Sequence, residues 1–224
     1  MEELVLKINN INKSYNDNVL FKDFNIDFYK NKVNCILGKS GCGKTTLLNI
    51  ISGITKNDSD NFKTIENLDI SYIFQEDRLV EWLTVEENIR LVSKNYYKKN
   101  DLIKIIDTYL KFLDIIKYKE YYPQMLSGGI RQRVNIARAL IYPSKIIIMD
   151  EPFKSIDIVN KKNIINNLKD ILKKEERTVL FVTHDIDEAL CLGEKIFILE
   201  SNPTRIKSVL NNSKELNKEN ITII

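Results

Sequence analysis

Short apolar runs alternate with segments of helical hydrophobic spacing along most of this chain. Short apolar runs between polar turns are typical of strands, and apolar residues at every third or fourth position are typical of amphipathic helices. We predict strands over residues 4–8, 19–28, 33–37, 70–74, 146–149, 179–182 and 195–199. We predict helices over residues 44–52, 84–96, 102–113, 130–141 and 164–172, and another capped by Asp185 with Glu188 three residues later. This alternation favours an α/β fold with a mostly parallel sheet.

Five of the seven glycines lie in two short loops. The first, Gly38-Lys39-Ser40-Gly41-Cys42-Gly43-Lys44-Thr45, matches G-x-x-x-x-G-K-[ST] and lies between a predicted strand and a predicted helix, as a phosphate-binding loop requires. Its glycines let successive N–H groups converge on phosphate oxygens, and the helix adds its positive end. We expect the backbone from Gly38 to Thr46 to hold phosphates, Lys44 to reach the β- and γ-phosphates, and the Thr45 hydroxyl to ligate Mg²⁺.

Two adjacent carboxylates follow the predicted strand 146–149. By themselves Asp150 and Glu151 fit a loop with two exposed acids equally well. Together with a phosphate loop, Asp150 is interpreted as the acid that holds Mg²⁺, and Glu151 as the base that deprotonates the attacking water.

Three further residues are candidates because of their place beside predicted strands. His184, the single histidine, follows strand 179–182 and is interpreted as a γ-phosphate contact, although a structural role is the commoner fate of such a residue. Gln75 ends strand 70–74 and could contact Mg²⁺ or the attacking water. Tyr15 lies in a polar turn and could stack on adenine or simply pack. The carboxyl edge of a parallel sheet, where His184 and Asp150 meet, is where ligands bind.

The second glycine loop contains Ser127, Gly128 and Gly129 and precedes a predicted helix. Adjacent glycines at a helix start form an anion site, whereas the alternative is a flexible turn. Because the first loop already holds a nucleotide, we interpret the second as a site for a nucleotide shared between two chains.

Composition and charge limit the other possibilities. The net charge of +3, with acidic and basic residues interleaved, argues against a nucleic-acid binder. The cysteines Cys35, Cys42 and Cys191 fit no metal spacing and are expected to be reduced thiols. No apolar run approaches the ~20 residues that span a bilayer, and no secretory signal is present, so we expect the chain to stay in the cytoplasm.

Taken together, these motifs resemble those of ATP-binding cassette (ABC) ATPases over nearly the whole chain. The matching elements are the A-loop (Tyr15), Walker A (Gly38–Thr45), Q-loop (Gln75), LSGGQ signature (Leu126–Gln132), Walker B with its glutamate (Asp150, Glu151), D-loop (Ser155-Ile156-Asp157) and switch histidine (His184). The resemblance implies one P-loop NTPase domain over 1–224. It would contain a RecA-like core of about 1–75 and 141–210, a small antiparallel β subdomain, a helical subdomain of about 76–140 and a polar tail of about 211–224.

Several more specific sequence segments are similar to those of importers of the nitrate, sulfonate and taurine type. This group of importers also transports thiamine-precursor pyrimidines. The segments include Phe74-Gln75-Glu76-Asp77-Arg78-Leu79, Asp150-Glu151-Pro152-Phe153 and Val182-Thr183-His184-Asp185. Two departures stand out. Segment 53–69 is short and lacks the usual glycine-bearing β element. The D-loop has Lys154-Ser155-Ile156-Asp157 where Ser-Ala-Leu-Asp is common, and it retains the aspartate.

The resemblance implies an ATPase that dimerises around two ATP, with Ser127, Gly128, Gly129 and Asp157 contributing to the nucleotide site. Its partners would be a second ABC ATPase subunit, expected to be an identical chain, a membrane permease at the cytoplasmic face of the membrane and, indirectly, a solute-binding protein. The permease would contact residues 76–124, with Trp82 as an anchor; a buried core tryptophan is the alternative. The rival functions are an ABC ATPase acting on ribosomes or DNA and an inactive nucleotide sensor.

One more expectation concerns reactivity. Because Cys42 lies at a predicted helix N-terminus, we expect its thiol pKa to be lowered, so that thiol reagents inhibit and ATP protects.

Overall fold

A mixed six-stranded sheet forms the centre of the molecule in the computed structural model, which describes residues 3–59 and 69–211. The strand order is β4-β5-β6-β3-β7-β8, and every neighbouring pair is parallel except β7 with β8. These strands are β3 (Val33–Leu37), β4 (Ile70–Ile73), β5 (Ile146–Asp150), β6 (Thr178–Thr183), β7 (Lys195–Glu200) and β8 (Arg205–Asn211). A two-stranded antiparallel hairpin, β1 (Leu4–Tyr15) with β2 (Asn18–Tyr29), lies apart from this sheet.

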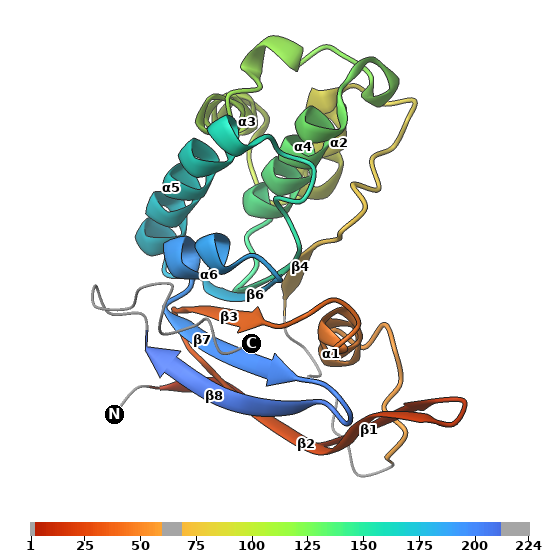
Figure 1. Ribbon diagram of the computed structural model, residues 1–224. Helices are drawn as coiled ribbons and strands as arrows, with labels where there is room; N and C mark the ends of the chain where they lie inside the picture. Colours follow the sequence, from red (N-terminus) through yellow and green to blue (C-terminus); the bar gives the residue numbers. More distant parts are fainter. Residues whose placement is uncertain (1–2, 60–68, 212–224) are drawn as a thin grey trace.

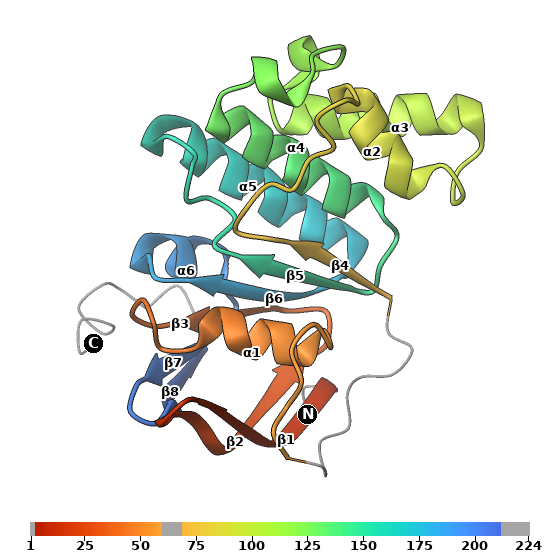
Figure 2. The ribbon, with the colours of Figure 1, turned by 90° about the vertical axis from the view of Figure 1, so that its right-hand side faces the viewer.

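Helices cover the sheet unequally (Figures 1 and 2). α1 and the β1–β2 hairpin lie on one face, while α5 and α6 lie on the other. α4 contacts β4 on that second face, and α2 and α3 pack on α4 farther from the sheet. The helices are α1 (Lys44–Ile51), α2 (Val85–Ser93), α3 (Lys99–Phe112), α4 (Gly128–Ile141), α5 (Ile158–Glu175) and α6 (Ile186–Leu192), with short 3₁₀ turns at Ile116–Tyr118 and Pro123–Met125.

Alternate residues of each central strand enter different cores. In β5, Ile146 and Ile148 pack with α1 and the hairpin, while Ile147 and Met149 pack with the helices of the opposite face. All five residues of β3 and all six of β6 are buried, which explains why both sequences are mostly apolar. The expected α/β fold with a mostly parallel sheet is confirmed.

The predicted strands differ from the structure in two places. The first strand does not end at residue 8, because β1 continues to Tyr15 through repeated register shifts and a left-handed residue at Asn10 (φ 60°). Such irregularities break the period-two alternation by which a strand is recognised. The strand 195–199 is not the last one, since β8 follows it at the sheet edge.

Side chains cap both α2 and α6, and the predicted cap at Asp185 differs from expectation in one respect. Thr84 and Glu87 form a reciprocal capping box at α2. Asp185 caps α6, but the side chain of Glu188 turns to Thr183 and Lys161. Two expectations fall largely outside the described residues: the short segment 53–69, of which 60–68 are not described, and the polar tail of about 211–224, of which only Asn211 is described. Within the described ranges, no helix is both long and apolar enough to cross a membrane.

Candidate nucleotide-binding site

The loop between β3 and α1 leaves the start of α1 open to an anion. Gly43 occupies the N-cap position with φ 91°, and no side chain caps the helix. A Cβ at Gly43 would lie 2.9 Å from the Phe21 ring, so both the backbone and the packing require glycine here. Because the first turn carries neither a cap nor an acidic residue, its free N–H groups can take phosphate oxygens.

The lysine of this loop is buried and folded back over the backbone. Lys44 Nζ donates to the carbonyl oxygens of Gly38 at 2.8 Å and Lys39 at 2.9 Å. Lys44 is only 5% exposed, so water screens its positive charge little at the loop. These contacts hold the ammonium group beside the helix N-terminus.

Asp150, at the carboxyl end of β5, is 2% exposed, and its Oδ1 atom has no hydrogen-bond partner. Burial raises the pKa of this carboxyl, while a hydrogen bond from Thr45 and the nearby Lys44 oppose the shift. A buried oxygen without a partner is costly, and a hard cation satisfies it. The residues present therefore fit Mg²⁺, with the Asp150 carboxylate and the Thr45 hydroxyl as oxygen donors.

Glu151 and His184 lie together at the ends of β5 and β6. His184 Nδ1 is 3.0 Å from Glu151 Oε1. The Glu151 side chain is 12% exposed, and that of His184 is 52% exposed. Glu151 has a left-handed backbone (φ 45°), and its N–H donates to the Val182 carbonyl at 3.0 Å. The structure thus joins two residues that are 33 positions apart.

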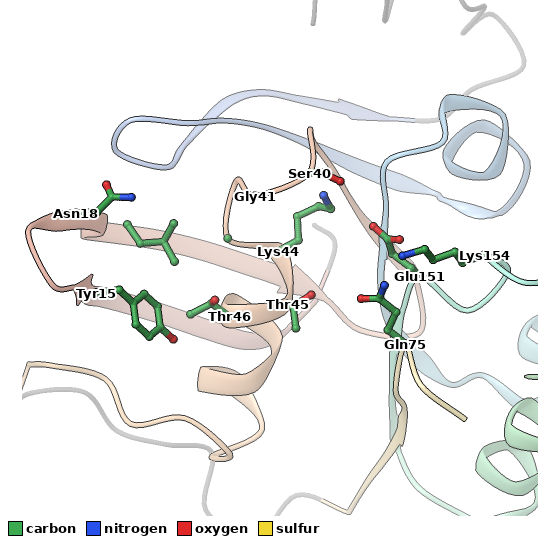
Figure 3. A pocket seen from close by; sticks show the side chains of 12 residues that line it. Tyr15, Asn18, Ser40, Gly41, Lys44, Thr45, Thr46, Gln75, Glu151 and Lys154 are labelled. Atoms are coloured by element: carbon green, nitrogen blue, oxygen red, sulfur yellow. The ribbon is translucent and has the colours of Figure 1, made fainter. Parts of the chain in front are cut away.

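A cavity of about 390 Å³ unites much of the predicted site (Figure 3). Tyr15 and Asn18 lie at one end, Gln75, Glu151 and Lys154 lie at the other, and the glycine loop lies between them. The full lining is Tyr15, Asn18, Leu20, Ser40, Gly41, Gly43, Lys44, Thr45, Thr46, Gln75, Glu151 and Lys154. A neighbouring cavity of about 300 Å³ brings Asp150 together with Thr45 and Gln75.

Sequence reasoning did not single out Asn18, Leu20 or Lys154 as candidate site residues. Asn18 and Leu20 reach the cavity because the hairpin folds beside the glycine loop, which no local pattern reveals. Lys154 lies three residues after Glu151, and that proximity was the one available signal.

The residues of the second glycine loop do not line the cavity. Ser127 precedes α4, and a Cβ at Gly129 would lie 2.9 Å from the Ser155 carbonyl oxygen. Asp157 caps α5 by accepting from Asn160 N–H at 3.0 Å, and it also lies outside the cavity lining. Within one chain, the two glycine loops are therefore separate, and the second packs against the segment that precedes α5.

The expected lowering of the Cys42 thiol pKa was wrong. Its side chain is fully buried, and burial raises the thiol pKa despite the nearby Lys44 ammonium. The thiol points into the core while only the backbone faces the loop, so desolvation outweighs the helix N-terminus.

The comparison with known proteins agrees with this geometry. The model of the family described as ABC transporter matches residues 21–154. The chain belongs to the ABC transporter family. An uncharacterized ABC transporter ATP-binding protein of Methanocaldococcus jannaschii is 34% identical over 97% of this chain and 86% of its own length. The aliphatic sulfonates import ATP-binding protein SsuB of Bacillus cereus is 34% identical over 93% of this chain and 86% of its own length.

A solved relative extends the similarity to the fold. The dimeric structure of the ABC transporter cassette MJ0796 shares 30% identity with a TM-score of 0.80, covering 92% of this chain and 98% of that one. The same cassette was also solved as a dimer in a post-hydrolysis state with ADP and Pi, at 29% identity over the same shares and with the same TM-score. As a member of this family, the chain is an ATPase that binds adenine nucleotide.

Proposed function

We propose that this chain supplies energy to an ABC importer by binding and hydrolysing ATP as a dimer that drives a separate membrane permease. The observation that carries the proposal is the unpartnered, buried Oδ1 of Asp150 beside the open N-terminus of α1. A buried oxygen without a partner destabilises the fold, whereas a Mg²⁺–nucleotide would supply partners for this oxygen and for the free N–H groups together.

The residue roles follow from their positions. Residues 38–46 and Lys44 bind the phosphates, and Tyr15, half exposed at the far end of the cavity, stacks on adenine. Thr45, Asp150 and Gln75 hold Mg²⁺, which when bound offsets negative charge on the phosphates. Glu151 orients and deprotonates the attacking water, and His184, hydrogen-bonded to Glu151, contacts the γ-phosphate.

The nucleotide site is completed by a second copy of the chain. Ser127, Gly128 and Gly129, together with Asp157, lie outside the cavity of their own chain, and we expect them to contact the nucleotide of the partner. The dimeric state of the solved MJ0796 cassette supports this arrangement. In this proposal the chain divides into a core of about 1–75 and 141–210 and a helical subdomain of about 76–140.

The helical part offers the surface for a permease. Trp82 is 78% exposed just before α2, so it is no core residue. Aromatic side chains dominate interface hot spots, and an exposed tryptophan on this layer suits such an anchor. The resulting complex places the chain at the cytoplasmic face of the membrane. Sulfonate-like solutes are the first substrates to test because of the similarity to the SsuB proteins, followed by nitrate, taurine and pyrimidines.

Hydrolysis is tested with Glu151→Gln. We expect this variant to bind ATP, to lose kcat by roughly 10²–10⁴-fold, and to accumulate as an ATP-bound dimer in size-exclusion chromatography. Wild-type turnover would eliminate Glu151 as the base.

Transport is tested by purifying the tagged chain from native membranes. A permease and a solute-binding protein among the co-purified proteins are expected, and ligands can then be screened on that binding protein. Ribosomal or DNA-repair proteins without a permease would instead support a role on ribosomes or DNA.

A further inference from the structure

A buried charged network lies behind His184. Glu188 on α6 is 4% exposed, and Thr183, the last residue of β6, is 1% exposed. The Thr183 hydroxyl donates to Glu188 Oε2 at 2.6 Å, and the same hydroxyl oxygen accepts from the Asp185 N–H at 3.0 Å. The residues on both sides of His184 are therefore fixed to Glu188 through one hydroxyl group.

Asp185 strengthens the same turn. Its Oδ1 atom accepts from the Asp187 N–H at 2.8 Å, so it caps the helix that carries Glu188. The turn that presents His184 is thus closed by side chains on both its strand side and its helix side, while the imidazole itself stays half exposed.

A lysine connects this turn to another element. Lys161 Nζ lies 2.7 Å from Glu188 Oε1 and 3.4 Å from Asp185 Oδ2. Lys161 belongs to the first turn of α5, and its N–H donates to the carbonyl of Asp157, the N-cap. The start of α5 and the turn of His184 therefore share a largely buried ion pair.

We propose that Lys161 and Glu188 are positioning residues that hold His184 against Glu151 and link it to the segment ending at Asp157. The inference rests on the proposed function, in which His184 and Glu151 act on ATP. Desolvating a carboxylate is costly, and an apolar residue would pack α6 on the sheet at lower cost, but it could not direct the Thr183 hydroxyl. A displacement of about 1 Å at a reacting group is enough to cost about 10²-fold in rate.

The pair is tested with Lys161→Met, which keeps the length of the side chain but removes its charge. At saturating Mg²⁺–ATP we expect kcat to fall about tenfold or more while KM for ATP changes little, because the phosphate loop is untouched. Lys161→Arg retains the ion pair and should retain most of kcat. Lys162→Met, on the neighbouring exposed position, is the matched control and should behave as wild type.

A double-mutant cycle with His184→Ala separates positioning from general structural damage. If Lys161 and Glu188 act through His184, Lys161→Met and Glu188→Gln should lower kcat no further in the His184→Ala background. Thermal unfolding of each variant identifies any that fail to fold. If Lys161→Met fails to fold, the conservative Glu188→Gln is used to test the Lys161–Glu188 pair.

The outcomes separate the positioning role of Lys161 and Glu188 from the proposed catalytic role of His184. Equal kcat for Lys161→Met and Lys162→Met, or the same fold-loss with and without His184, would overturn this inference and leave the proposed function intact. Wild-type kcat in His184→Ala would contradict the assigned role of His184 itself.

Discussion

Arg131 on α4 donates two parallel hydrogen bonds to Asp77, two residues after Gln75. They measure 2.8 Å (Nε to Oδ2) and 3.0 Å (Nη2 to Oδ1). Arg138 binds the backbone of the same segment by donating to the Asp77 carbonyl at 3.0 Å. The helix that begins with the second glycine loop therefore fixes the segment leading from the cavity to Trp82.

Asp77→Asn should lower the free energy of unfolding by about 1–2 kcal/mol at neutral pH, because it breaks a bidentate, partly buried pair. Arg131 lowers the pKa of Asp77, so this contribution is present above the usual carboxyl range and is lost as the pH falls through the lowered value. The difference between the two proteins in urea unfolding should shrink below about pH 4. Glu81→Gln, which removes a more exposed partner of Arg131, is the control and should cost less.

Alkylation should distinguish the three cysteines. Cys42 and Cys35 are fully buried, and burial raises the pKa of both thiols, whereas Cys191 is partly exposed. In the native protein we expect iodoacetamide to modify Cys191 first and to leave Cys42 unmodified, as read by peptide mass spectrometry. Protein unfolded in urea should react at all three. Fast, ATP-sensitive modification of Cys42 would contradict its burial.

Gly128 and Gly129 form a matched pair for substitution. A Cβ at Gly129 would lie 2.9 Å from the Ser155 carbonyl oxygen, while the nearest atom to one at Gly128 is 4.0 Å away. Gly129→Ala should destabilise the fold by about 1–3 kcal/mol through overpacking. Gly128→Ala should be neutral or stabilising by up to about 1 kcal/mol, because alanine favours a helix. Urea unfolding of the monomer measures the free energy of unfolding of both variants. Equal stabilities would refute this packing argument.

Asp150→Asn should have opposite effects without and with nucleotide. Burial raises the pKa of Asp150, so its ionised form destabilises the ligand-free fold above that pKa, and the penalty is relieved as the pH falls through it. At neutral pH the ligand-free variant should be at least as stable as wild type. Mg²⁺–ATP at 100-fold its Kd should stabilise wild type by about 2.7 kcal/mol and the variant by much less. Calorimetry with and without Mg²⁺ measures both, and equal stabilisation would argue against Asp150 as a metal ligand.

The parts of the fold that were predictable are those with a local physical cause. β3, β5 and β6 are buried on both faces, so their sequences are mostly apolar. β8 was missed because it lies at the edge of the sheet, and none of its residues is buried. β1 was cut short because its register shifts and polar positions such as Asn10 imitate a loop.

In the candidate site, too, some features were predictable from the sequence and others were not. The glycine loop and Asp150 were predictable because phosphate binding imposes a fixed order of residue types. The contact between His184 and Glu151, and the support from Lys161 and Glu188, depend on how α5 and α6 pack beside β6. The direction of the Cys42 pKa shift was misjudged because a position at a helix start does not reveal which way the side chain points.

Trp82 is the single tryptophan of the chain, and it is largely exposed on the helical layer. With excitation at wavelengths beyond the absorption of the ten tyrosines, the fluorescence therefore comes from that one spot on the surface, and solutes such as iodide should quench it readily. Any molecule that covers this region will shift the emission to shorter wavelength and shield it from quenching. The protein thus carries a built-in optical probe of its helical surface, with no label to attach.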